Sequence, residues 1–135
     1  MATVEVIRLP TLSPAGSHGW RIETSGAVEW RGTILILWPG KTTDLASVPK
    51  LLRPLIDDDE PGLRLAAMLH DAAYRNWPCF SPVSLTRREA DAMLFDVAVA
   101  QGLPSWKAWL VWCGVRLFGW RHWKRRVLPR PCRDG

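Results

Sequence analysis

The sequence predicts an α+β fold, in which a small N-terminal antiparallel sheet is followed by a helical half with three helices. Residues 4–38 contain short alternations of apolar and polar side chains separated by Gly, Pro and Ser, a pattern typical of strands and turns. Residues 63–123 instead contain helix formers whose apolar side chains recur at helical spacing. The length of 135 residues suits one domain, so we expect a single domain over 1–128 and a tail at 129–135.

Three strands are expected in the N-terminal part of the chain. They lie at 4–9, 20–24 and 28–38, where apolar and β-branched residues gather. The stretch 11–19 is rich in Pro, Gly and Ser, which predicts a loop. Residues 33–38 carry hydrophobic side chains on both faces, so we expect this part of the third strand to be the most buried.

The three helices are expected at about 63–76, 86–101 and 105–123. The second should begin with a capping box, because Thr86 is followed three residues later by Glu89. Gly102 is suited to end that helix, since glycine readily adopts the left-handed conformation found after helices. Ser105 is expected to cap the third helix.

Several classes of protein are excluded by composition. Every apolar run of about eighteen residues is interrupted by charge, which argues against a transmembrane segment. The first residues lack the basic start and apolar run of a signal peptide, so we expect synthesis in the cytoplasm. The three cysteines are widely spaced, with no Cys-x-x-Cys pair, so neither a structural zinc site nor a disulfide framework is expected.

The middle of the first long helix carries the residues best suited to chemistry. His70 and Tyr74 are four residues apart and therefore share one helix face, while Asp71 points toward a neighbouring face. If the first two helices pack antiparallel, Asp91 reaches a ring nitrogen of His70 and the Tyr74 hydroxyl. An imidazole oriented in this way is suited to act as a general base. The same cluster is equally compatible with a satisfied buried network that only fixes helix packing.

The stretch His-Asp-x-x-Tyr-Arg-Asn at 70–76, with Arg87, Arg88 and Asp91 in the next helix, resembles the active-site helices of the phospholipase A2 superfamily, above all its small prokaryotic forms. The stretch Thr-Asp-Leu-Ala-Ser-Val-Pro at 43–49 stands where those enzymes keep a calcium loop.

This resemblance implies a calcium-dependent lipid ester hydrolase that acts at a membrane. His70 would take a proton from the water that attacks the ester carbonyl. Asp71 and the backbone near Asp44, together with the Asp44 side chain, would bind the calcium ion. Tyr74 and Asp91 would orient His70.

A second resemblance covers residues 28–123. The order of a strand, Thr-Asp-x-x-Ser-Val-Pro, His-Asp-x-x-Tyr, Ala-Asp and a final Val-Arg-x-x-Gly at 115–119 resembles a family of uncharacterised phage and prophage proteins with a domain of unknown function. It implies a chain made in the host cytoplasm and, as an alternative to the hydrolase, a non-catalytic virion or tail-associated protein that binds a partner.

The end of the chain is basic and rich in tryptophan. Residues 106–135 hold eight basic residues and one acidic residue, whereas the rest of the chain is almost neutral. One stripe at helical spacing consists of Trp106, Trp109, Cys113, Leu117 and Trp120. The residues expected to form a membrane or partner surface are Trp106, Trp109, Trp112, Trp123, Lys124, Arg125 and Arg126.

Three interpretations of the third helix remain open. It could be a core helix with a solvated tail, it could lie on an anionic lipid surface, or it could bind a protein such as a phage structural component. No specific nucleic-acid partner is expected, because no nucleic-acid reading module accompanies the basic tail. Arg116 lies mid-helix among apolar residues, so we expect a carboxylate partner from the loop 57–60 or from Asp96.

Overall fold

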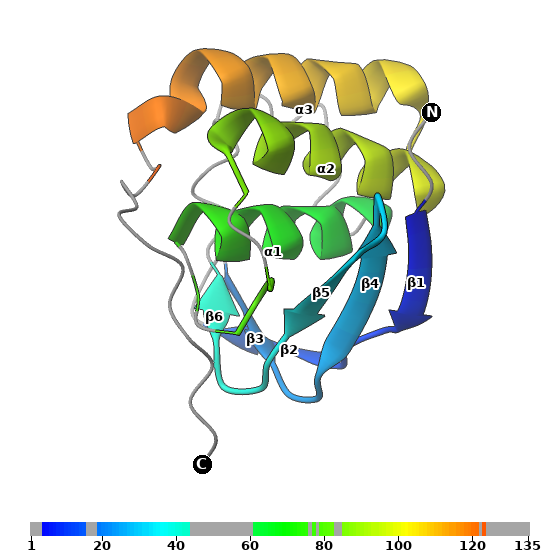
Figure 1. Ribbon diagram of the computed structural model, residues 1–135, viewed down its shortest axis with the longest axis vertical. Coiled ribbons are helices and arrows are strands. Elements are labelled where there is room, and N and C mark those ends of the chain that lie inside the picture. Colours follow the sequence, from blue (N-terminus) through cyan, green and yellow to red (C-terminus); the bar gives the residue numbers. More distant parts are fainter. Residues whose placement is uncertain are drawn as a thin grey trace.

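The structure is a computed structural model that describes residues 4–15, 19–43, 61–75, 77, 79–82, 85–121 and 123. Within these residues, six short strands precede three α-helices and a final 3-10 turn (Figure 1). This arrangement confirms the α+β class and the order of sheet and helices expected from the sequence. The expected tail at 129–135 and the acidic loop 57–60 lie outside the described residues.

The strands form two antiparallel sheets of three strands each. The first has the order β1-β4-β5 and consists of β1 (Val4–Arg8), β4 (Gly26–Trp30) and β5 (Thr33–Leu37). The second has the order β2-β3-β6 and consists of β2 (Leu12–Ala15), β3 (Gly19–Ile22) and β6 (Thr42–Thr43). The sequence had predicted the antiparallel arrangement but not its division into two sheets.

The predicted loop at 11–19 was wrong in part, because it contains β2. Pro14 lies within this strand. A proline removes a backbone donor, so it is tolerated only at sheet edges, and β2 is an edge strand whose single neighbour is β3. The Pro-rich composition therefore marked a sheet edge and not the absence of a strand.

The predicted single strand at 28–38 was also wrong, because a two-residue turn divides it into β4 and β5. Arg31 and Gly32 both have positive φ values, 50° and 77°, and Trp30 pairs with Thr33 across the turn. Such a turn matches the twist of a hairpin. The more buried strand is β4, in which Val28 and Trp30 are enclosed, whereas Ile34 in β5 faces solvent.

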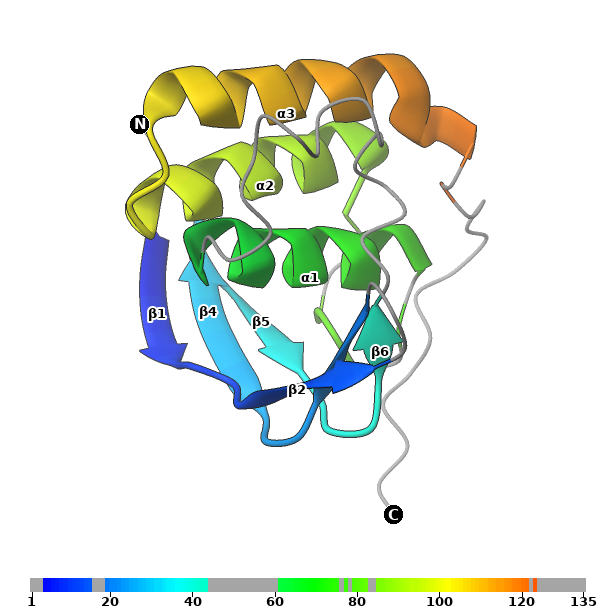
Figure 2. The ribbon, with the colours of Figure 1, turned by 180° about the vertical axis from the view of Figure 1, so that it is seen from behind.

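The helices stack in the order α1, α2, α3 away from the strands, as both views show (Figures 1 and 2). Their bounds are α1 (Pro61–Arg75), α2 (Arg87–Ala100) and α3 (Ser105–Phe118), followed by the 3-10 turn η2 (Gly119–Arg121). Because α1 lies between the sheets and α2, side chains on most of its circumference are buried. Among the described residues, no helix has the length and apolar content needed to span a bilayer.

The helix ends confirm two of the predicted capping features and correct a third. The Thr86 hydroxyl accepts a hydrogen bond from the Glu89 backbone at 3.1 Å, and the Glu89 carboxylate accepts one from the Thr86 backbone at 3.0 Å. Gly102 follows α2 with a φ of 102°. Ser105 does not cap α3: it is the first helical residue, and Pro104 occupies the cap position without a side-chain bond. The helix also ends earlier than expected, at Phe118.

Candidate functional site

Helix α1 presents His70 and Tyr74 on one buried face. The two rings lie 4.1 Å apart between centroids, and both side chains are fully enclosed. The spacing of four residues brings them together, and the alanine, leucine and methionine residues around them favour the helix. Two polar side chains buried in this way require hydrogen-bond partners.

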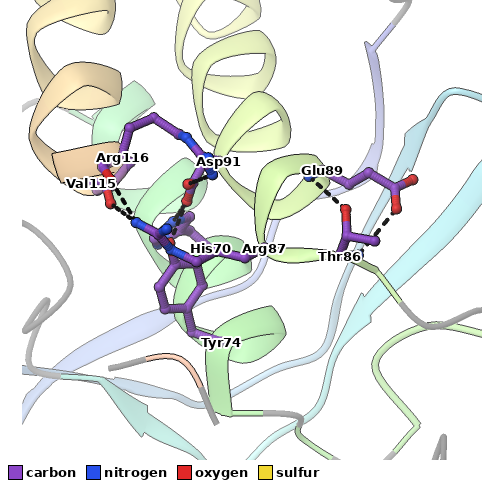
Figure 3. A network of polar contacts seen from close by, with 8 residues as sticks. All are labelled: His70, Tyr74, Thr86, Arg87, Glu89, Asp91, Val115 and Arg116. Atoms are coloured by element: carbon purple, nitrogen blue, oxygen red, sulfur yellow. Dashed lines mark hydrogen bonds and ion pairs between the residues drawn. The ribbon is translucent and has the colours of Figure 1, made fainter. Parts of the chain in front are cut away.

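Helix α2 supplies that partner, as the sequence predicted. The Oδ1 atom of Asp91 lies 2.7 Å from Nε2 of His70 and accepts a hydrogen bond from the Tyr74 hydroxyl at 2.5 Å (Figure 3). The Asp91 side chain is itself fully buried. The helices run in opposite directions, so residues 70 and 74 of α1 face residues 91 and 87 of α2.

Helix α3 completes the network with Arg116. Its Nη1 atom donates to the second carboxylate oxygen of Asp91 at 2.8 Å. The sequence had predicted a carboxylate partner for this mid-helix cation, and Asp91 supplies it in place of the expected Asp96. Asp96 instead accepts a hydrogen bond from Nε1 of Trp30 at 2.8 Å, and the loop 57–60 lies outside the described residues.

Arg87 is a member of the network to which sequence reasoning gave no role. Its Nε atom donates to the Tyr74 hydroxyl at 3.1 Å, while Nη2 donates to the backbone carbonyls of Val115 and Arg116 at 2.8 and 2.7 Å. These carbonyls belong to the last turn of α3, where a cation is favoured by the helix dipole. The side chain therefore connects all three helices (Figure 3).

The network fixes the charge state of its central residues. Burial acts to raise the pKa of Asp91, but the hydrogen bonds from His70, Tyr74 and Arg116 outweigh it, so the pKa falls below the ordinary value of 3.8. Burial raises the pKa of Tyr74 above its ordinary value of 10.0, and the hydrogen bond and negative charge of Asp91 add to this effect, against Arg87. At neutral pH, Asp91 is a carboxylate and Tyr74 a neutral phenol.

The ionised Asp91 also determines which nitrogen of His70 carries hydrogen. A carboxylate can only accept, so Nε2 must be the protonated nitrogen. In the neutral imidazole, Nδ1 is then the atom with a lone pair. The contact predicted from the sequence thus gives the oriented imidazole that general-base chemistry needs.

Asp71 lies at the edge of this cluster, on another face of α1. Its Oδ2 atom accepts a hydrogen bond from the Thr43 hydroxyl at 2.6 Å, and its Oδ1 atom lies 3.3 Å from Nε of Arg75. Calcium takes six to eight oxygen ligands, and no cluster of three or more His, Cys, Asp or Glu side chains occurs among the described residues. Asp71 is the one expected calcium ligand among the described residues. Asp44, the other expected ligand, lies outside them.

The predicted tryptophan surface is divided between exposed and partly buried positions. Trp106 and Trp109 are exposed, whereas Trp112 and Trp123 are half-buried. The Trp123 ring meets Tyr74 edge-on, with centroids 5.1 Å apart. Lys124, Arg125 and Arg126 lie outside the described residues.

Comparison with known proteins identifies a family. The family described as "Protein of unknown function (DUF1353)" matches residues 20–115, a range that includes His70, Tyr74 and Asp91. The chain is 36% identical over 94 residues to the uncharacterized protein y4iH of Sinorhizobium fredii (strain NBRC 101917 / NGR234). That match covers 69% of this chain and 36% of the relative, which is therefore much longer than the matched region. No solved structure matches the chain. Because the family match extends over most of its length, the chain belongs to the DUF1353 family.

Proposed function

We propose that the chain is a lipid ester hydrolase of the phospholipase A2 type, in which His70 is the general base. The observation that carries this proposal is the 2.7 Å contact between Nε2 of His70 and Asp91. It orients the ring with Nε2 toward the carboxylate, in agreement with the roles implied by the His-Asp-x-x-Tyr motif at 70–74. Tyr74 and Asp91 are positioning residues in this proposal.

The proposed step transfers one proton and forms one bond. A water molecule gives a proton to Nδ1 of His70 while its oxygen attacks the carbonyl carbon of the ester. The imidazolium that forms is stabilised by the Asp91 carboxylate at Nε2. When the tetrahedral intermediate collapses, the proton passes from Nδ1 to the leaving alcohol oxygen, which restores the neutral base. Calcium, which the phospholipase resemblance implies, would polarise the ester carbonyl.

The test is fatty-acid release from anionic phospholipid vesicles, measured with calcium and with a chelator. We expect the wild-type chain to release fatty acid and His70→Gln to abolish release while remaining folded by circular dichroism. Asp96→Asn is the matched control, because it alters a carboxylate of α2 that accepts from Nε1 of Trp30 and lies outside the His70 network. It should retain turnover.

Two outcomes contradict the proposal. Absence of release from wild type under both conditions would exclude the hydrolase. Equal release by wild type and His70→Gln would exclude His70 as the base. Release that is unaffected by the chelator would remove calcium from the proposal and leave the His70 step intact.

Complete burial of the network favours a second candidate, a non-catalytic protein that binds a partner. The resemblance to phage and prophage proteins would make it a virion or tail-associated component. His70, Tyr74 and Asp91 are all fully buried, as expected of groups that only hold three helices together. In that case, His70→Gln and Arg87→Met should both lower the free energy of unfolding, and no variant should differ from wild type in the vesicle assay.

A further inference from the structure

The outer face of α3 is apolar where a surface helix is ordinarily polar. Trp106, Trp109, Leu117 and Trp120 are 59%, 56%, 66% and 60% exposed. In a helix of 3.6 residues per turn, the three positions within α3 fall on one side, and Trp120 follows them in the 3-10 turn η2. The opposite side of α3 packs on the domain through its buried residues, which are Ala108, Val111, Gly114 and Val115.

This face points away from the rest of the domain. Helix α3 is the helix farthest from the strands, and it contacts α2 on its inner side (Figures 1 and 2). On that inner side, the Arg116 side chain donates to Asp91. Arg87 donates to the backbone carbonyl of Arg116 in the last turn of α3. The exposed indole rings therefore remain on the outside when the polar network is complete.

Basic side chains accompany the exposed rings. The Lys107 ammonium lies 5.6 Å from the centroid of the Trp106 ring, and the Arg121 guanidinium lies 5.5 Å from that of Trp120. The sequence from residue 97 to residue 133 contains eight lysine and arginine residues and no aspartate or glutamate. The apolar stripe therefore lies within a segment whose lysine and arginine side chains are not balanced by any aspartate or glutamate.

We propose that this face of α3 docks on an anionic lipid surface. Indole rings favour the boundary between headgroups and acyl chains, and adjacent Lys and Arg side chains are attracted by anionic headgroups. A protein partner would have to place carboxylates opposite these cations, whereas an anionic bilayer presents negative charge over its whole surface. The biological role of this docking surface rests on the proposed lipid hydrolase, but binding of the surface to vesicles can be measured without turnover.

The test is co-sedimentation of the full chain with vesicles of phosphatidylcholine alone or mixed with phosphatidylglycerol. We expect binding to the anionic vesicles that weakens as salt increases. Trp106→Gln combined with Trp109→Gln should weaken binding about tenfold or more, because two apolar side chains no longer leave water. The matched control is Ile7→Gln with Ile34→Gln, which alters two exposed apolar residues of the sheet and should bind as wild type does.

The electrostatic part is tested by Lys107→Gln and Arg121→Gln, each expected to weaken binding to anionic vesicles about fivefold at low salt. Quenching of tryptophan emission by brominated lipid should be strong in wild type and reduced in the double tryptophan variant.

Equal binding to both kinds of vesicle, or equal binding by wild type and the tryptophan variant, would overturn the assignment. Self-association that disappears in the tryptophan variant, without vesicle binding, would replace the lipid with a second copy of the chain. Vesicle binding without fatty-acid release would support the docking surface while excluding the hydrolase.

Discussion

Gly119 lies directly against the hydroxyl of Tyr74. A Cβ atom at position 119 would be 2.9 Å from the Tyr74 Oη atom and 3.3 Å from Cε2. The backbone at Gly119 has a φ of −69° and a ψ of −18°, which any residue adopts. Glycine is therefore favoured at position 119 because Tyr74 leaves too little room for a Cβ atom, and not because the backbone conformation requires glycine.

Gly119→Ala should lower the free energy of unfolding by about 1–3 kcal/mol, because the added methyl group must displace Tyr74 or the end of α3. Urea denaturation measures the change. Tyr74→Phe removes the nearest atom, so the double variant should lose less stability than the sum of the two single variants. Strict additivity would mean that the two residues do not interact.

Asp91→Asn should be destabilising by about 1–3 kcal/mol at neutral pH, because an amide accepts less strongly and places an NH2 group beside existing donors. The matched control is Asp96→Asn on the same helix, where a single neutral donor, Nε1 of Trp30, faces the carboxylate. The control should cost less. Equal decreases of the urea midpoint in both variants would contradict the role of Asp91 as the shared acceptor of the polar network.

Tyr74 is the single tyrosine of the chain, so tyrosinate absorbance reports its ionisation alone. Its raised pKa predicts that absorbance does not develop near pH 10 but only at higher pH or on unfolding. The unfolded chain loses this proton first, so stability should decrease as pH rises above 10. Ionisation at the ordinary pKa in a chain that remains folded would argue against the buried contact with Asp91.

Acid should weaken the fold through Asp91. Because its folded pKa is below the ordinary 3.8, the unfolded state takes up the proton first as pH falls. The stabilisation that the Asp91 carboxylate provides is present above the ordinary pKa of 3.8, and it is lost as pH falls through the lower pKa of the folded state. Urea unfolding at decreasing pH should therefore show the difference between wild type and Asp91→Asn becoming smaller. A difference that stays constant down to the acid transition would exclude this linkage.

The helical half was the more predictable part of the chain. Spacings of three or four residues predict the helix positions and the capping box at Thr86. The contact of His70 and Tyr74 with Asp91 needs one further assumption, that the first two helices run antiparallel. Such local patterns determine which side chains share a face. They needed no knowledge of the strands.

The strands and the third helix's partners were less predictable. The hairpin turn at Arg31 and Gly32 lacks the Asn-Gly or Asp-Gly sequence that usually marks it, so two strands resembled one. Arg116 carried a clear signal of a buried ion pair, but nothing in the sequence indicated which carboxylate lies opposite. That choice depends on the packing of α3 against α2, which brings together residues 25 positions apart.

The single carboxylate of Asp91 has a consequence for how the helices open. It accepts from α1 and from α3, across separations of 21 and 25 residues, while itself belonging to α2. Detaching α1 or α3 from α2 would leave a buried donor or charge without its partner, so partial opening of the helical half is unfavourable. Backbone amides in the middle of all three helices should accordingly exchange with solvent deuterium together, through one global event.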